Sequence, residues 1–166
     1  MPDRVVVVNT TPLIALAASG CFDALRLLFD RVIVPFEVAD EIRVGGPHGI
    51  GVAELHSAAW LDIQPSHAVI PVYLANALDW GEAAVIATAL ERAVPLVCID
   101  ETAGRRMARL AGLQLTGSLG VLIKAKQRGF PVVIADAVRR MHDQGIWLSA
   151  QGIEGDGCGG HASGIL

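Results

Sequence analysis

The sequence predicts an α/β protein, a three-layer α/β/α sandwich built around a mainly parallel sheet. Short apolar runs rich in β-branched residues alternate along the chain with longer segments of helical character, and this alternation is typical of parallel strands joined by helices. The chain has 166 residues, of which 52% are hydrophobic, so it is long and apolar enough to bury one sizeable core. No repeat of fixed period is visible, which excludes solenoid architectures.

The first half of the chain contains clear strand and helix patterns. Val5–Val8 is a continuous β-branched run, as expected for a strand that is buried on both faces. Pro12 stands where the first helix is expected to begin, with Thr10 or Thr11 as its cap. The other elements expected in this half are a helix over 22–29, a strand over 31–34, a helix over 35–44, a helix over 52–59 and a strand over 60–64.

The second half begins with an ambiguous segment, residues 65–78, and then becomes clearer. Asp79-Trp-Gly-Glu82 resembles a capping box in front of an alanine-rich helix over 83–93. The elements expected after it are a strand over 95–99, a helix over 102–110, a strand over 113–115, a helix over 116–128, a helix over 132–144 and an edge strand over 146–148. Residues 1–149 are therefore expected to form one domain, followed by a flexible glycine-rich tail over 150–166.

Composition limits the cell compartment and the partners. The apolar stretch from Val5 is interrupted at residues 9–12, well short of the roughly 20 residues that span a bilayer, and no secretory signal pattern is visible. We therefore expect a cytoplasmic protein. The net charge is -4, yet residues 101–144 hold eight Lys and Arg against three Asp and Glu. This basic region is a candidate for local phosphate contacts.

Four oxygen-bearing side chains are expected at one edge of the sheet. Asn9 and Asp100 follow two apolar strands, Glu82 opens a helix and Glu41 lies late in another. In parallel sheets, ligands bind beyond the carboxyl ends of the strands. Clustered carboxylates need a neutralising cation, and oxygen-only ligands suit Mg²⁺ or Mn²⁺. The set points to metal-assisted hydrolysis of a phosphodiester.

Each of these residues also has a purely structural interpretation. Taken by itself, Asn9 could simply organise the turn before Pro12. Taken by itself, Glu41 could be a solvated charge on a helix. Glu82 fits the reciprocal half of the capping box, and Asp100 fits a cap of the helix that follows it. The set taken together favours a site.

Five motifs resemble, in order, those of PIN domains. They are Val-Val-Asn9-Thr-Thr-Pro-Leu-Ile-Ala-Leu, Val-Ile-Val-Pro35-Phe-Glu-Val-Ala-Asp-Glu41-Ile, Leu-Asp-Trp-Gly-Glu82-Ala-Ala-Val-Ile-Ala-Thr-Ala, Leu-Val-Cys-Ile-Asp100-Glu101 and Leu-Thr-Gly-Ser-Leu-Gly-Val-Leu. The chain resembles VapC-like toxin ribonucleases, especially the subgroup described as nucleic-acid-binding proteins containing a PIN domain. The resemblance covers about residues 5–149.

The resemblance implies a Mg²⁺- or Mn²⁺-dependent endoribonuclease that acts on single-stranded RNA. Its acidic quartet would fall on Asn9, Glu41, Glu82 and Asp100, with Glu101 as a neighbouring carboxylate; the metal ligands would be Glu41, Glu82, Asp100 and Glu101. Asn9 departs from the family pattern, which has Asp there, and an amide offers an oxygen without charge. A small antitoxin partner and a homodimer are also implied.

Further residues near these motifs are expected to contact RNA. Thr116-Gly-Ser118 precedes a helix whose free N–H groups suit a phosphate, although ordinary capping explains the same residues. The expected RNA-binding residues are Thr10, Thr11, Arg105, Arg106, Thr116 and Ser118. Arg109 and the basic end of the helix over 116–128 extend the same basic region.

Two other functions fit parts of the pattern. One is a PIN fold that has lost catalysis through Asn9 and keeps RNA or protein binding. The other is a phospho-acceptor receiver domain that uses Asp100, which fits an acidic strand end. The receiver is disfavoured because no lysine stands at the end of a late strand to contact a phosphoryl group.

Overall fold

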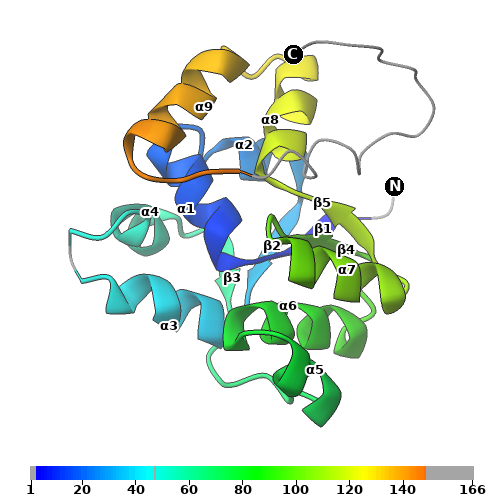
Figure 1. The fold of residues 1–166 in the computed structure, drawn as a ribbon. Helices are drawn as coiled ribbons and strands as arrows, with labels where there is room; N and C mark the ends of the chain where they lie inside the picture. Colours follow the sequence, from blue (N-terminus) through cyan, green and yellow to red (C-terminus); the bar gives the residue numbers. More distant parts are fainter. Residues whose placement is uncertain (1–2, 47, 149–166) are drawn as a thin grey trace.

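The fold is a parallel five-stranded sheet with helices on both faces, as the computed structural model shows (Figure 1). The structure describes residues 3–46 and 48–148. The strands are β1 (Val5–Val8), β2 (Arg31–Val34), β3 (Leu61–Ile63), β4 (Leu96–Cys98) and β5 (Gln114–Thr116). They lie in the order β3-β2-β1-β4-β5, and every adjacent pair is parallel. The predicted α/β sandwich is confirmed.

Nine helices occur in the described part of the chain. They are α1 (Thr10–Ala18), α2 (Ala24–Leu28), α3 (Phe36–Val44), α4 (Val52–Ser57), α5 (Val72–Ala77), α6 (Trp80–Glu91), α7 (Thr102–Leu110), α8 (Ser118–Gln127) and α9 (Ile134–Asp143). Helices α1, α2, α8 and α9 lie on one side of the sheet, and α5 and α6 lie on the other (Figure 1).

The centre of the core is β1, which pairs with β2 on one side and with β4 on the other. Val6, Val7 and Val8 have no exposed surface, because strands covered by helices on both faces bury both sets of side chains. Helix α6 is mostly apolar and is buried from Gly81 to Ala89, with Glu82 and Thr88 as the polar residues of this stretch, as expected for a helix that is enclosed by its neighbours. It contacts β1, β4, α3, α5 and α7.

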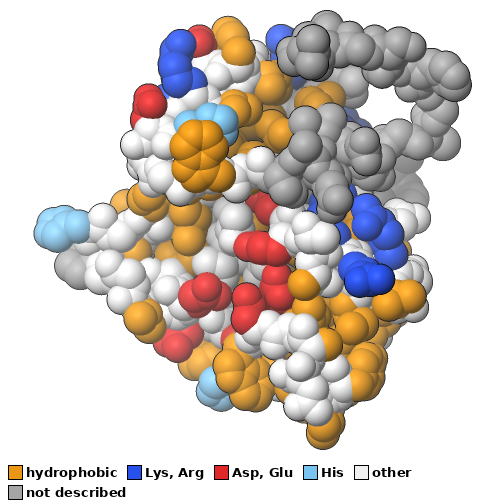
Figure 2. All heavy atoms as spheres, viewed as in Figure 1, with side chains coloured by type: hydrophobic (Ala, Val, Ile, Leu, Met, Phe, Trp, Pro, Cys, Tyr) orange, Lys and Arg blue, Asp and Glu red, His pale blue; other side chains and the backbone are white. Residues whose placement is uncertain are grey.

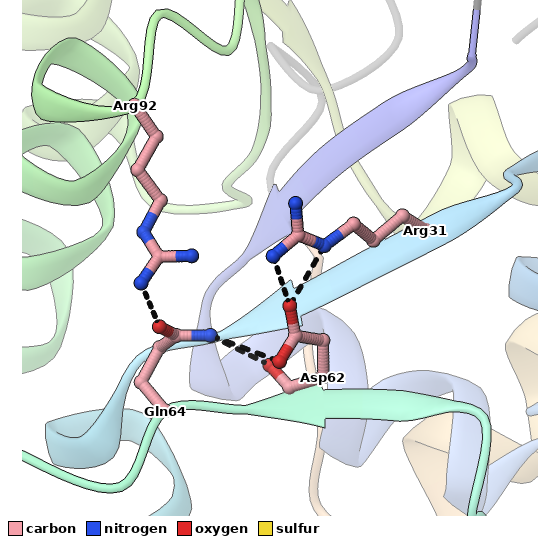
Figure 3. Close-up of polar contacts among 4 residues, drawn as sticks. All are labelled: Arg31, Asp62, Gln64 and Arg92. Carbon is pink, nitrogen blue, oxygen red and sulfur yellow. Dashed lines mark hydrogen bonds and ion pairs between the residues drawn. The ribbon is translucent and has the colours of Figure 1, made fainter.

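A polar network joins the C-terminal end of α6 to the edge strand β3 and its neighbour β2 (Figure 3). Arg31 at the start of β2 donates through Nε to Asp62 of β3 over 2.7 Å. The Gln64 amide donates to the Asp62 carboxylate over 3.1 Å and accepts a bond from Arg92, the residue that ends α6. The network therefore ties the last turn of α6 to the edge of the sheet, while its first turn lies at the candidate site.

Two sequence expectations need correction, and the ambiguous segment can be assigned. The ambiguous segment 65–78 contains α5, which begins after Pro71. Helix α1 begins at Thr10, two residues before Pro12. Residues 146–148 form no strand: Gly145 has a φ of +82° and the Ile146 N–H bonds to the Met141 carbonyl over 2.9 Å. This bond closes the end of α9.

The expected tail over 150–166 lies outside the described residues. None of the described helices combines the length and the apolar character needed to cross a membrane.

Candidate functional site

The candidate residues gather at the carboxyl edge of the sheet. Asn9 follows β1, Asp100 and Glu101 follow β4, and Ser118 opens the helix that follows β5. Glu41 reaches this edge from α3 and Glu82 from the first turn of α6. Figure 2 shows acidic side chains in the middle of this face and basic side chains beside them, over α7. The topology thus brings together the side chains that the sequence separates by about 90 residues.

Asn9 occupies the N-cap position of α1, but its side chain bonds to Glu101 and makes no capping hydrogen bond. It is 3% exposed, and its Nδ2 donates to Glu101 Oε2 over 3.3 Å. Its Oδ1 is buried without a hydrogen-bond partner among the described residues, and α1 has no side-chain cap at this position. The interpretation of Asn9 as a turn-organising residue is wrong, and an unused acceptor oxygen remains at the site.

Two threonines in the first turn of α1 hold two of the glutamates. Thr10 donates to Glu41 Oε2 over 2.8 Å, and Thr11 donates to Glu101 Oε1. Neither threonine is the N-cap of α1, which is Asn9. Glu41 is therefore more than a solvated helix charge, because the Thr10 bond joins α1 to α3.

A glycine makes room for the approach of Glu41 and Asn9. A Cβ atom on Gly81 would lie 2.9 Å from Glu41 Oε2 and 3.2 Å from Asn9 Oδ1. Both distances are shorter than ordinary van der Waals contact, so a larger residue at the start of α6 would displace one of these oxygens. Gly81 lies within the capping-box pattern and the third motif of the sequence but is not among the predicted site residues.

Glu82 is buried, with 5% of its surface exposed, in the first turn of α6. Its N–H donates to Asp79 Oδ1 over 2.8 Å, which confirms the predicted cap. Burial, together with the charges of Asp79, Glu101 and Glu41, raises the pKa of Glu82 to about 7, although a hydrogen bond from the backbone N–H of Asp79 acts to lower it. At neutral pH this carboxyl is therefore poised between its two protonation states.

Both oxygens of Asp100 accept bonds from Ser118. The Ser118 N–H donates to Oδ1 over 2.8 Å, and the Ser118 hydroxyl donates to Oδ2 over 2.5 Å. Burial raises the pKa of Asp100, and the Ser118 bonds act against that rise. Asp100 therefore caps α8 across the sheet, a contact that the sequence interpretation of Asp100 as a cap of the following helix did not include.

The expected RNA contacts divide into buried and exposed groups. Arg105 is 2% exposed, and its Nη1 donates to the backbone carbonyls of Ile99 and Thr116. It is closed off from an RNA strand, which corrects its expected role. Thr116 and Ser118 are also buried. Arg106 is exposed on α7 and stays a candidate for an RNA contact.

The acidic side chains do not form a compact metal cage. Within the described ranges, no three His, Cys, Asp or Glu side chains are close enough to hold one ion. The reason lies in the local bonds: Thr10, Thr11 and Ser118 each hold a different carboxylate, and like charges repel without a cation between them.

The residues nevertheless fit a divalent cation. The available donors are oxygens, which Mg²⁺ and Mn²⁺ prefer. The buried Asn9 Oδ1 lacks a partner among the described residues, and the pKa of Glu82 is raised in part by neighbouring carboxylates. A cation between Asn9, Glu41 and Glu82 would give the buried Asn9 Oδ1 a partner. It would also offset the repulsion between the carboxylates around Glu82.

Comparison with known proteins adds the family. A family model described as a PIN domain matches residues 5–155. No curated protein matches the chain. The match covers most of the chain and agrees with the parallel sheet and its acidic edge. The chain therefore belongs to the PIN-domain family, a nuclease fold whose members generally use divalent metals.

Proposed function

We propose that the protein is a Mg²⁺- or Mn²⁺-dependent endoribonuclease that hydrolyses phosphodiester bonds of single-stranded RNA. The observation that carries the proposal is the approach of Asn9 Oδ1 and Glu41 Oε2 to the same glycine, Gly81, at the carboxyl edge of the sheet. Glu82, the next residue, has a pKa raised to about 7. Perturbed carboxyl groups at the ligand-binding edge of a parallel sheet are typical of a catalytic site.

Each residue has a distinct task in this proposal. The carboxylates of Glu41, Glu82 and Asp100, which are not close enough together in the metal-free geometry to hold one ion, would have to move together to hold the cation, and Asn9 would contribute its unused amide oxygen. When bound at these residues, a divalent cation would supply a lowered pKa for the attacking water and would offset charge on the phosphate. Glu101 accepts bonds from Asn9 and Thr11, so in this proposal it orients the Asn9 amide.

Substrate binding needs cations near this acidic edge, because a phosphodiester carries a negative charge. Arg106 and Arg109 are exposed on α7, the helix that directly follows Asp100 and Glu101 in the chain. We assign the RNA backbone to this surface of α7, which adjoins the acidic face (Figure 2). Contacts to phosphates make binding weaken as salt concentration rises.

The biological role that we propose is that of a toxin in a toxin–antitoxin pair. In that role a small antitoxin protein would block the acidic edge, and the active form would be a homodimer in the cytoplasm. The PIN-domain match supports this role only through the nuclease fold. Growth arrest on expression and relief by a co-expressed neighbouring gene product would test the antitoxin, and the sedimentation mass would test the dimer.

The decisive experiment measures cleavage of a mixed-sequence single-stranded RNA with Mn²⁺, with Mg²⁺ or with a chelator. The proteins compared are wild type, Asp100→Asn and Asn9→Asp. We expect wild type to cut only with metal and Asp100→Asn to be at least about a hundredfold slower. Cleavage in chelator, or equal rates for wild type and Asp100→Asn, would refute the proposed site.

One observation favours a second candidate, a PIN-fold module that binds RNA or a protein without cutting. The Asn9 Nδ2 donates to Glu101, so an amide stabilises the acidic edge at a position where a carboxylate would require a cation. If wild type is silent and Asn9→Asp cuts, this second function replaces the first. Silence from all three proteins would remove the metal-site assignment itself.

A further inference from the structure

Arg105 is a buried arginine that uses only one of its three guanidinium nitrogens in hydrogen bonds among the described residues. It lies in α7 and is 2% exposed, the largest of the fully buried side chains in the described ranges. Its Nη1 donates to the Ile99 carbonyl over 2.8 Å and to the Thr116 carbonyl over 3.3 Å. Its Nε and Nη2 are buried and have no hydrogen-bond partner among the described residues.

Such an arrangement is energetically unfavourable as packing alone. A desolvated guanidinium with unused donors destabilises a fold, and an apolar side chain of similar volume would fill the same space without that penalty. The position of Arg105 therefore calls for a role of its charge and its fork of donors, which a methionine or leucine would lack.

The two carbonyls that Arg105 holds flank the Asp100 site. Ile99 directly precedes Asp100 and follows β4, while Thr116 ends β5 and is separated from Ser118 by Gly117 alone. One guanidinium nitrogen thus bridges the ends of the two strands. Ser118, which donates two bonds to Asp100, stands on the second of these strand ends.

The guanidinium also lies close to the carboxylate. A Cβ atom on Gly117 would be 2.6 Å from Asp100 Oδ1 and 3.2 Å from Arg105 Nη1. Both groups therefore face the same glycine. The positive charge of Arg105 favours a carboxylate at this place, where burial and Glu101 disfavour it.

We propose that Arg105 is the positioning residue of Asp100: it bridges the ends of β4 and β5 and thereby holds the Asp100 carboxylate on Ser118. Its effect on metal binding rests on the proposed nuclease function, whereas its hold on Asp100 does not. Removal of such supporting partners typically weakens metal binding or activity by about 10- to 100-fold.

The test combines a metal-free measurement with a metal-binding measurement. Amide hydrogen exchange reports the Ser118 N–H bond to Asp100, and the Glu82 amide, which donates to the Asp79 carboxylate over the same 2.8 Å, serves as the internal reference. Titration with Mn²⁺ measures the affinity of the site. The variants are Arg105→Met, Arg105→Lys and the matched control Arg106→Met, whose side chain is exposed on the same helix.

We expect Arg105→Met to speed Ser118 exchange about tenfold, the equivalent of one lost hydrogen bond. Glu82 exchange stays at the wild-type rate, and Mn²⁺ binds about 10- to 100-fold more weakly. Arg105→Lys keeps the charge and one donor, so both quantities recover to within a few-fold of wild type. Arg106→Met leaves both unchanged.

The two proposals fail separately. Unchanged Ser118 exchange in a folded Arg105→Met overturns the positioning role, as does equal acceleration of the Ser118 and Glu82 amides, which indicates general loosening. If wild type neither binds Mn²⁺ nor cuts RNA but Ser118 exchange responds, the nuclease proposal fails and the positioning role stands. If Arg105→Met does not fold, Arg105→Gln, which keeps a donor without charge, decides by the same Ser118 criterion.

Discussion

The raised pKa of Glu82 predicts that the metal-free protein loses stability as the pH rises through neutrality. In the folded chain burial and the neighbouring carboxylates raise this pKa from 4.5 to about 7. The folded state thus holds its proton more tightly than the unfolded state does. The resulting stabilisation is complete below pH 4.5 and is lost as the pH rises through about 7.

The size of the effect follows from the shift. The full change in pKa corresponds to about 3 kcal/mol. Between pH 5 and pH 8 the part lost is about 2.5 kcal/mol, because the unfolded carboxyl is already mostly ionised at pH 5. Glu82 is only 5% exposed, so solvent screening reduces this figure little. Glu82→Gln removes the ionisation and is expected to remove this part of the pH dependence.

Urea unfolding in a chelator at several pH values, followed by circular dichroism, measures the effect. The quantity to compare is the stability of wild type minus that of Glu82→Gln, which should fall by about 2.5 kcal/mol from pH 5 to pH 8. Glu91→Gln, an exposed position on the same helix, is the matched control and should follow wild type. Asp79→Asn keeps an oxygen for the cap and removes a charge, so it moves the transition to lower pH. Parallel curves for wild type and Glu82→Gln would refute the reasoning.

Further predictions concern the space around the site and the charge at position 9. Gly81→Ala would place its Cβ 2.9 Å from the end of the flexible Glu41 side chain, so RNA cleavage falls while urea stability changes by less than about 1 kcal/mol. Gly104→Ala would meet the Ile99 side chain at 2.9 Å in the core, so the same measurement should show a loss of about 1–3 kcal/mol; equal stability losses in the two variants would contradict this contrast. Asn9→Asp replaces a donor to Glu101 by a like charge at 3.3 Å, so its Tm in chelator should lie about 4–8 °C below wild type and recover with Mn²⁺. A thermal scan that shows no metal response for this variant would count against a cation at Asn9.

The sequence predicted the fold well where burial determines the pattern. The run Val5–Val8 is apolar because β1 is covered on both faces, and Asp79 marks the start of α6 because a cap has a local partner. The segment over 65–78 was ambiguous because α5 buries only Leu74 and shows little periodicity. Ile146 and Leu148 pack against the core beyond α9, whereas Trp147 between them is 74% exposed, and the sequence does not distinguish this alternation from that of an edge strand.

The candidate site was predictable in its residues and not in its contacts. Strand ends at Asn9 and Asp100 can be read from short apolar runs, and these positions meet at one edge by topology. The partners of the carboxylates depend on side-chain directions across distant elements. Arg105 shows what the sequence does not reveal, because it resembles its neighbour Arg106 there. The packing of α7 against β5 buries Arg105 and leaves Arg106 exposed.

The pattern of donors explains why Glu82 in particular has its pKa raised to about 7. Thr10, Thr11 and Ser118 supply hydroxyl groups to three other carboxylates, and Asn9 supplies an N–H to one of them. Glu82 receives a backbone N–H of Asp79 and otherwise faces burial and like charges. Protonation of Glu82 removes its unfavourable buried charge, and a bound divalent cation would offset the same charge. An aspartate at position 9 would remove the N–H donor to Glu101 and add a negative charge. The amide of Asn9 therefore stabilises the metal-free site.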